Sequence, residues 1–452
     1  MIVLFCIVER KLVEIAKSKF VDASFALKDS AYIVASIELG NTTTKCILTA
    51  TDLKEGRTYF LDKTVELTAT IRPPKDGEYV FGLTVRGQPL SREAVAEATK
   101  KTLLRSLTKA KISVDDLDFV VRSTGVVAGF ETPEEVGGII KALADGCLAA
   151  GIPPRKMTGA MNKSNLPTAL QKHSFMDAVI FDNTVASVSC IKTPIVANEM
   201  EGELVLAGIK EGAKWTSIDF RNPCVGLDFG TTLSGRVTDG KLPYANVVGS
   251  YCGLAGAIFD ALAQPVTETA LQLTGSSDTN VPESYVADAM KLIKIKRVTS
   301  ERRFGTVPVN PKGLKESGVV LIGVDVGENG SRLNELSKLS TELLKEGGKA
   351  KVMGLIDLTA AELVKKLLEV MWDHGLDGAI GLTGRGVITG TKPALIQEKL
   401  GDRELVFVDD GLARGAAVLA RCLHSLGTPK NPLGGVAGGK CIMDARRRMQ
   451  RI

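Results

Sequence analysis

The chain has 452 residues, 44% of them apolar, with 57 Lys and Arg against 52 Asp and Glu and a formal net charge of +5. This length suggests two to three domains, and the mild charge argues for no particular polyanionic partner, so we expect no nucleic acid among the partners. The eight cysteines are scattered without a C-x-x-C pair and only three histidines are present, which argues against a disulfide framework and a zinc centre. We therefore expect a cytoplasmic protein with reduced thiols.

The chain opens with MIVLFCIV, an apolar run of eight residues followed by Glu9, Arg10 and Lys11. Such a run is too short to span a bilayer, and no basic segment precedes it. We interpret this run as a buried strand or a loose leader, assign residues 1–31 to an N-terminal leader segment and expect no membrane attachment.

A regular pattern of strands and helices begins at Tyr32. It predicts strands at 32–39, 44–50 and 58–67, a helix at 91–107, a strand within 116–125, a helix at 133–150 and a strand centred near Ile180. Strands that alternate with helices after an antiparallel opening predict an α/β domain with a mixed sheet. We expect this first domain to cover residues 32–205.

The same order of elements starts again at Cys224. The pattern predicts strands at 224–229, 232–238 and 243–249, helices at 255–263 and 360–373, a strand at 378–382, a helix at 392–400, a strand at 404–408 and a helix at 411–421. A T-x-x-E capping box at Thr359 and Glu362 predicts where the helix at 360–373 begins. We expect a second domain over 206–430 with an insertion near 275–350, and a Gly-rich loop and basic tail over 431–452.

Two similar phrases, about 190 residues apart, stand at the head of the two halves: IELGNTTTK around Glu38 and LDFGTTLSG around Asp228. In each, an acid follows an apolar run and precedes a glycine turn and a cluster of hydroxyl residues. A glycine turn brings backbone N–H groups close to a bound anion, because no Cβ intervenes. The acid repels phosphate, so its partner would be a Mg²⁺ ion or the water around it. The candidate phosphate-binding residues are Gly40, Asn41, Thr42, Thr43, Lys45, Gly230, Thr231 and Thr232.

Two alternatives remain open from the residues alone. The phrase LIGVDVGENGS places Asp325, Gly327 and Ser331 at the same offsets, although helical periodicity follows it, so Asp325 competes with Asp228 as the second acid. Cys252, in SYCGLAGAIFDAL, is a candidate ligand for an iron–sulfur cluster shared across a dimer.

The motifs together resemble the superfamily of actin, the 70-kDa heat-shock chaperones and the sugar kinases, in a matching order over roughly residues 32–425. IELGNTTTK and LDFGTTLSG look like its two phosphate hairpins, VVRSTGVVAGF and DDGLARGAAVLA like its two connectors, and IGLTGRG like its adenosine turn. The resemblance implies two duplicated ribonuclease-H-like domains with mixed five-stranded sheets flanked by helices, with ATP and Mg²⁺ in the cleft between them. It implies adenosine contacts at Thr383, Gly384, Arg385 and Gly386, and interdomain connectors at Thr124, Gly125, Gly411 and Gly415.

Within that superfamily, ELGNTTTKCI, GLTGRG and NPLGG with GGKCI are similar to the archaeal family called methanogenesis marker protein 14. The superfamily's first acid is usually Asp, and here it is Glu38, which is one methylene longer. The resemblance implies a slow Mg²⁺-dependent ATPase that acts as a conformational switch on a protein partner, such as a metalloenzyme of methanogenesis. The alternatives are a small-molecule kinase of the same fold, for which the sequence nominates no base, and an iron–sulfur activator like those of acyl-CoA dehydratases. A homodimer is compatible with all three.

Overall fold

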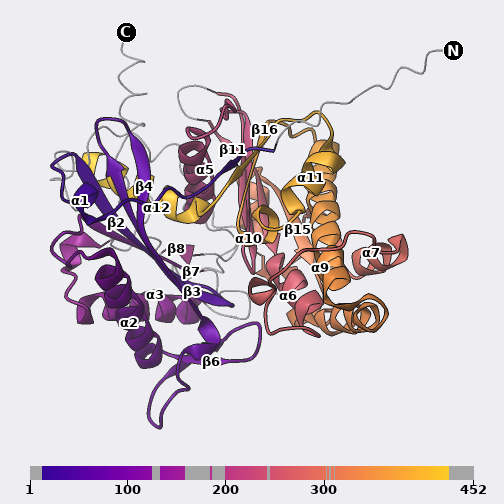
Figure 1. Ribbon diagram of the computed structural model, residues 1–452, viewed down its shortest axis with the longest axis horizontal. Coiled ribbons are helices and arrows are strands. Elements are labelled where there is room, and N and C mark those ends of the chain that lie inside the picture. The colour runs from indigo at the N-terminus through magenta and orange to yellow at the C-terminus, as the bar shows by residue number, and fades with distance from the viewer. Residues whose placement is uncertain are drawn as a thin grey trace.

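The protein has a mixed α/β fold with several sheets, and Figure 1 shows it as two lobes that lie side by side. We call them the N-terminal lobe, built on a five-stranded sheet, and the C-terminal lobe, built on an eight-stranded sheet. The computed structural model describes residues 13–124, 133–157, 184–185, 199–241, 245–301, 303–304, 307–309 and 311–426. Among these residues, no helix is both long enough and apolar enough to cross a membrane.

The sheet of the N-terminal lobe has the order β4-β3-β2-β7-β8. Its strands are β2 (Ala31–Leu39), β3 (Thr43–Asp52), β4 (Arg57–Leu67), β7 (Phe119–Thr124) and β8 (Thr184–Val185). The first three are antiparallel to one another in chain order, and β7 pairs with β2 in parallel. A separate two-stranded hairpin is formed by β5 (Val80–Leu83) and β6 (Pro89–Ser91).

Side chains along β2 alternate between the two faces of its sheet, as the period of a strand requires. Ile33, Ala35 and Ile37 belong to a core that also contains Leu103 of α2 (Arg92–Ala110) and Leu143 of α3 (Pro133–Ala149). Tyr32 and Val34 contribute to a second cluster on the other face. Both faces of the sheet are therefore covered.

The sheet of the C-terminal lobe has the order β1-β17-β16-β9-β10-β11-β15-β12. Its strands are β1 (Ile15–Ala16), β9 (Cys224–Phe229), β10 (Leu233–Thr238), β11 (Val247–Gly253), β12 (Lys294–Val298), β15 (Val320–Asp325), β16 (Ala379–Thr383) and β17 (Leu405–Val408). A two-stranded ribbon is formed by β13 (Arg303–Phe304) and β14 (Val307–Pro308). The helices after the β9–β11 unit are α6 (Gly256–Ala263), α7 (Glu283–Lys291), α8 (Pro311–Ser317), α9 (Leu333–Asp373), α10 (Arg385–Ile388) and α11 (Lys392–Leu400).

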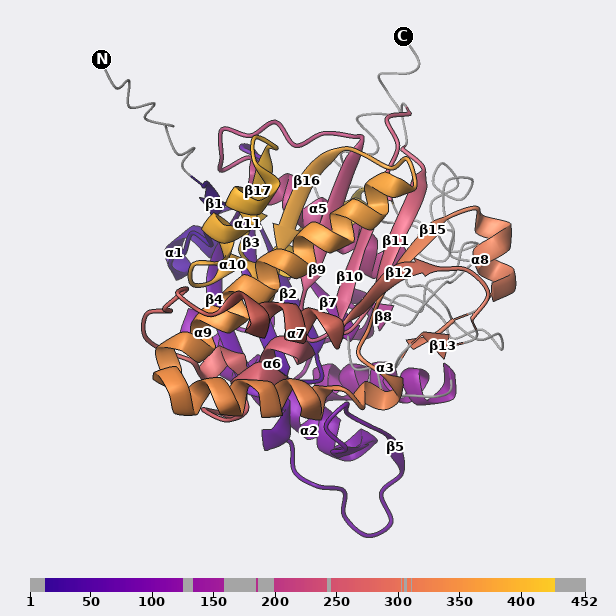
Figure 2. The same cartoon turned by 90° about the vertical axis from the view of Figure 1, so that its right-hand side faces the viewer.

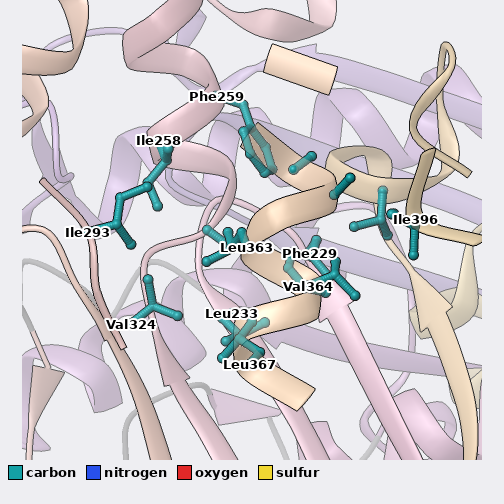
Figure 3. Close-up of a cluster of buried hydrophobic side chains, with 14 of the residues drawn as sticks. Phe229, Leu233, Ile258, Phe259, Ile293, Val324, Leu363, Val364, Leu367 and Ile396 are labelled. Atoms are coloured by element: carbon teal, nitrogen blue, oxygen red, sulfur yellow. The ribbon is translucent and has the colours of Figure 1, made fainter. Parts of the chain in front are cut away.

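Helix α9 crosses one face of this sheet (Figure 2). Its side chains Leu363, Val364 and Leu367 gather with Phe229 and Leu233 of the sheet in one apolar core (Figure 3). The helix runs from Leu333 with a break at Gly348, where φ is 73°. The capping-box prediction is therefore wrong, because Thr359 is a fully buried residue inside the helix and does not precede its first turn.

Two helices, α5 (Glu199–Ala213) and α12 (Gly411–Leu426), pack against each other between the sheets of the two lobes (Figure 1). Ala416 and Ala420 of α12 contact Tyr32 and Val34 of the N-terminal lobe, in the second cluster named above. The apolar face of α5 packs against β9 and β17 of the C-terminal lobe. The two helices approach so closely that a Cβ at Gly208 would overlap the carbonyl of Gly411.

The alternation of strands and helices predicted from the sequence is present, but two five-stranded sheets are not confirmed, since one sheet has eight strands. The strand predicted at 243–249 begins later, at Val247, and ends at Gly253. The strand predicted near Ile180 and the segment 431–452 lie outside the described residues. The described part of the segment interpreted as a leader contains α1 (Ala23–Ala26) and β1, which pairs with β17.

Candidate functional site

The two glycine turns that the sequence singles out each join a pair of antiparallel strands. Gly40 lies in the turn between β2 and β3, and Gly230 lies in the turn between β9 and β10. The Gly40 N–H donates to the Thr43 carbonyl at 2.9 Å, and a Cβ on Gly40 would lie only 2.9 Å from that oxygen. The turn is therefore tight enough to favour glycine.

Both turns open into one cavity of about 250 Å³ between the lobes. Its walls include the candidate acids Glu38 and Asp228 and the connector residue Gly411. The walls also include all the candidate phosphate and adenosine residues, namely Gly40, Asn41, Thr42, Thr43, Lys45, Gly230, Thr231, Thr232, Thr383, Gly384, Arg385 and Gly386. Residues from four separate segments of the chain thus meet at one place.

The other connector residues lie elsewhere. Gly415 faces α5, where a Cβ would overlap the Leu204 carbonyl. Thr124 is the last residue of β7 and pairs with Leu39. Gly125 lies outside the described residues.

Glu38 is held by Lys45, its partner across the β2–β3 ladder. Lys45 Nζ donates to both carboxylate oxygens of Glu38, at 3.1 and 3.2 Å. Burial acts to lower the pKa of Lys45, but Glu38 and Asp228 outweigh it and raise that pKa above its ordinary value. The cavity therefore keeps a fixed positive charge beside the first glycine turn, and Glu38 is largely engaged in holding it.

Asp228 is buried at the end of β9 and lines the same cavity. Burial is the largest cause that raises its pKa from 3.8 to about 7, and the charges of Glu38 and Asp410 act in the same direction against the opposing charge of Lys45. A cation bound beside Asp228 would stabilise the ionised form of this carboxyl group and so lower its pKa again.

The turn at Gly384 brings the adenosine segment against Asp228. Gly384 has a φ of 89°, and a Cβ there would lie 2.6 Å from Asp228 Oδ1 and 2.7 Å from the backbone nitrogen of Phe229. Only glycine combines this backbone conformation with so close an approach. The wall that follows the turn contains Phe259, Ile388 and Leu273, so this end of the cavity is partly apolar.

A chain of hydroxyl and carboxyl groups joins the two glycine turns. Thr231 Oγ1 donates to Thr42 Oγ1 at 2.9 Å, and Thr42 Oγ1 donates to Asp260 Oδ2 of α6 at 3.1 Å. The Ala270 N–H donates to the other oxygen of Asp260 at 2.8 Å. Burial raises the pKa of Asp260 despite these partners. The first turn is thus bonded to two separate elements of the C-terminal lobe.

Several cavity residues were missed by the sequence reasoning, and Asp260 is one of them. Lys63 of β4 pairs with both oxygens of Asp410, at 2.5 and 2.7 Å, and Asp410 immediately precedes α12. Lys392 pairs with buried Asp357 at 2.8 Å beside the adenosine turn. Asp410 could have been found from the DDG of the second connector. No local pattern identifies Lys63 or Asp260, because their partners Asp410 and Thr42 are far away in the chain.

The acidic residues suit a hydrated Mg²⁺ better than a metal held by protein ligands alone. No group of three or more His, Cys, Asp or Glu able to hold a metal occurs in the part of the chain that the structure describes. Mg²⁺ keeps several of its waters and is commonly held by one or two carboxylates together with phosphates of a substrate. Asp228 meets this requirement, while Glu38 is already bonded to Lys45.

The two alternatives from the sequence lie away from this cavity. Asp325 ends β15, accepts a hydrogen bond from the Gly327 N–H at 2.6 Å and pairs with Arg332 at 2.8 Å. Asp325 is absent from the walls of the cavity between the lobes. Cys252 is fully buried in β11 and packs with Val298 and Phe304, so its thiol does not reach a surface that a second copy could approach.

Comparison with known proteins places the chain among archaeal sequences. A family model described as "Uncharacterized protein conserved in archaea (DUF2114)" matches residues 31–450. An uncharacterized protein of Methanocaldococcus jannaschii is 51% identical over 458 residues, which covers 96% of this chain and 95% of that protein. An uncharacterized protein of Methanothermobacter thermautotrophicus is 50% identical over 454 residues, which covers 96% of this chain and 86% of that protein.

Similar solved structures are more distant. One is titled "Reductive activator for corrinoid,iron-sulfur protein", with 12% identity and a TM-score of 0.38, covering 86% of this chain and 60% of that one. Another is component A of the (R)-2-hydroxyglutaryl-CoA dehydratase of Acidaminococcus fermentans, with 12% identity and a TM-score of 0.37, covering 85% of this chain and 95% of that one. Similarities this weak carry no argument about the activity of this chain.

Proposed function

The chain belongs to the archaeal family described as DUF2114, and from its cavity we propose that it binds ATP with Mg²⁺ between its lobes and works as a slow ATPase switch. The observation that carries the proposal is the meeting of the two glycine turns, joined by the Thr231–Thr42 hydrogen bond, in one cavity with Lys45 and Asp228. Facing turns of this kind present backbone donors to a polyphosphate from both sides.

The order of strands supports a duplicated, ribonuclease-H-like origin for the two lobes. In the N-terminal lobe the order β4-β3-β2-β7 places three consecutive antiparallel strands beside a fourth that is parallel to the first. In the C-terminal lobe β11-β10-β9-β16 repeats this arrangement. On this proposal β1, β12 and β15 are additions to the second unit, and the domains predicted at 32–205 and 206–430 are the two units.

Each wall of the cavity then has a role in the bound state. Backbone N–H groups of the turn at Gly230 and the cation of Lys45 would hold the phosphates, with hydroxyls of Thr42 and Thr231 beside them, whereas the N–H of Gly40 is already bonded to the Thr43 carbonyl. Asp228 would hold Mg²⁺ through its waters, and the cation would supply neutralisation of charge on the transferred phosphoryl group. The segment from Thr383 to Gly386 would lie against the adenosine, with Phe259 and Ile388 on its apolar side.

We propose that the bound nucleotide acts on the partner protein by changing the arrangement of the two lobes. A bound polyphosphate would compete with the Thr231–Thr42 hydrogen bond, so its arrival and its hydrolysis change what joins the two turns. A switch of this type needs two arrangements whose balance a ligand can shift. The partner we propose is a metalloenzyme of methanogenesis, in keeping with the resemblance to methanogenesis marker protein 14.

A small-molecule kinase of the same fold is the second candidate, and Asp260 is the observation that favours it. This carboxylate lies in the cavity wall next to Thr42 and has a raised pKa, so it could accept the proton of a hydroxyl. An iron–sulfur activator with Cys252 as ligand is not supported, because the residue is buried within the sheet.

Titration calorimetry with ATP, with and without Mg²⁺, tests the proposal directly. We expect binding that is tighter with Mg²⁺, together with a rise in melting temperature, because a ligand of the native state stabilises it by mass action. The absence of heat and of any melting shift at millimolar nucleotide would rule out an ATP site.

A further inference from the structure

A second cavity, of about 370 Å³, lies next to the first glycine turn. Asn41 and Thr42 line both this cavity and the one between the lobes. Its other walls come from both lobes, with Ile71 and Arg86 on one side and Glu268 on the other. The volume falls within the range of pockets that hold small organic molecules.

The walls of the second cavity are mostly apolar, and their charged groups form one oppositely charged pair. Leu67, Ala69, Ile71, Pro73 and Pro89 supply apolar surface. Arg86 Nη1 lies 3.7 Å from Glu268 Oε1, which is too long for a hydrogen bond. Arg86 Nη2 donates to the Glu268 carbonyl at 2.7 Å and lies 3.6 Å from Asp260 Oδ2. The guanidinium of Arg86 and the carboxylate of Glu268 are therefore close together, but Nη1 makes no hydrogen bond to that carboxylate.

We propose that the second cavity binds a small zwitterion with an apolar body, namely an α-amino acid with an apolar side chain. Such a molecule carries a carboxylate and an ammonium group on one carbon, so it can lie across the pair, with its carboxylate against Arg86 Nη1 and its ammonium against Glu268 Oε1. Its side chain would lie against Ile71 and the neighbouring apolar wall, which gains from removal of that surface from water.

Charge argues for a zwitterion over a simple acid or a simple amine. A carboxylic acid would satisfy Arg86 but would meet the like charges of Glu268 and Asp260, which both lie within 4 Å of Arg86. An amine would pair with Glu268 but would face the guanidinium of Arg86. A molecule with both charges places an opposite charge against each member of the pair and a like charge against neither.

The second cavity is connected to the first glycine turn through named contacts. Arg86 approaches Asp260, Asp260 accepts from Thr42, and Thr42 accepts from Thr231. A ligand that draws Arg86 toward itself changes the charge beside Asp260 and so the bonding of Thr42. The amino acid should therefore alter affinity for ATP, and ATP should alter affinity for the amino acid by the same factor. This coupling rests on the proposed nucleotide site, whereas the binding itself does not.

The test uses the full chain and a panel of leucine, isoleucine, valine, methionine and phenylalanine, measured by calorimetry without nucleotide. We expect saturable binding of at least one of them, and no binding of 4-methylpentanoate or 3-methylbutylamine, which each lack one charged group of leucine. Failure of all five to bind at millimolar concentration overturns the proposal, and so does equal binding of leucine and either analogue.

Variants separate the charged pair from general effects on the fold. Arg86→Met and Glu268→Gln should each weaken amino-acid binding about tenfold or more, because each removes a hydrogen bond to a charged group. Arg221→Met is the matched control, since Arg221 is exposed and pairs only with Asp219 among the contacts of the described residues. Loss of binding in the control, or its retention in Glu268→Gln, contradicts the assignment. A repeat with ATP present measures the coupling, and absence of ATP binding there counts against the nucleotide site alone.

Discussion

The hydroxyl of Thr231 donates a 2.9 Å hydrogen bond to the hydroxyl of Thr42, although 189 residues separate the two in the chain. These residues belong to the two glycine turns of different lobes, so the turns are in direct contact. The contact is polar and small, and a phosphate oxygen could replace either hydroxyl as a partner. The two strand pairs with similar sequences therefore face each other in the structure.

The Thr42 hydroxyl should stabilise both the fold and the nucleotide site. Thr42→Val removes the group that donates to buried Asp260, so we expect the free energy of unfolding to fall by about 1–3 kcal/mol and ATP affinity to fall with it. Urea unfolding and calorimetry measure the two effects. Thr70→Val is the control, because Thr70 is exposed and bonds only to the Leu67 carbonyl among the contacts of the described chain. Equal losses in both variants would contradict the role of Thr42.

Lys45 should be needed for nucleotide binding in its own right. Lys45→Met leaves the Glu38 carboxylate without its partner, so we expect lower stability together with loss of ATP binding. The double variant Glu38→Gln, Lys45→Met removes the unpaired charge and should recover most of the stability without recovering binding. Melting curves and calorimetry on the two variants measure this. If the double variant binds ATP as tightly as the native chain, Lys45 does not contact the phosphates.

Asp228 should make stability depend on pH in a defined direction. Its pKa is raised in the folded protein from 3.8 to about 7, so between these values the native state binds more protons at this group than the unfolded chain does. The free energy of unfolding contributed by Asp228 therefore falls as pH rises through this window. Asp228→Asn should be more stable than the native chain above pH 7, by at most about 4 kcal/mol, and equally stable below pH 4.

The protonation of Asp228 should also affect the Mg²⁺-dependent binding of ATP. Mg²⁺ competes with the proton on Asp228, so we expect the benefit of Mg²⁺ for ATP binding to shrink below pH 7 in the native chain and to be absent in Asp228→Asn. Urea unfolding and calorimetry across the pH range supply both measurements. A stability difference that does not change with pH would show that Asp228 titrates near its ordinary value.

The close contact between Gly384 and Asp228 allows a steric test of the nucleotide site. Gly384→Ala would place a methyl group 2.6 Å from Asp228 Oδ1 in a backbone conformation that side chains resist. We expect a large fall in melting temperature and loss of ATP binding. Gly375→Ala is the matched control, since Gly375 has a φ of 71° but no atom within 4 Å of the added methyl. It should show only the cost of the backbone conformation, about 1 kcal/mol.

Turnover should distinguish a switch from a kinase. A switch lacks an acceptor in line with the γ-phosphate, so we expect hydrolysis on the order of one ATP per minute or slower. The rate should not respond to sugars or acetate, and it should change when proteins of a methanogen extract are added. Asp228→Asn should abolish the turnover while Asp325→Asn, which alters a carboxylate outside the cavity, should retain it. A phosphorylated metabolite, with turnover lost in Asp260→Asn, would establish the kinase.

Local pattern was sufficient for most of the strands near the site. The β-branched run before Glu38 and the run before Asp228 have a strand period and end at glycine turns, so β2, β3, β9 and β10 could be predicted within two residues. The placement of Gly384 in the cavity followed only from the resemblance to a superfamily. Its contact with Asp228 joins segments that no local pattern connects.

Contacts between distant segments could not be predicted in the same way. Helix α5 was not predicted, because its glycine and small residues weaken the helical signal and its position depends on α12. Lys63 and Asp260 have no local pattern that marks them in sequence, and their bonds to Asp410 and Thr42 form only when the lobes meet. The capping box at Thr359 predicted a helix start at 360, but α9 continues without a break from the kink at Gly348 past that residue, so the local motif was misleading.

The packing of α12 on the N-terminal lobe has a consequence for biosynthesis. Ala416 and Ala420, which cover Tyr32 and Val34, are synthesised about 380 residues after them. At about 5–20 residues per second, this face of the sheet is without its cover for tens of seconds or more. A nascent chain that stalls before residue 411 would expose an apolar sheet, so the N-terminal lobe is completed only after the strands of the C-terminal lobe have been made.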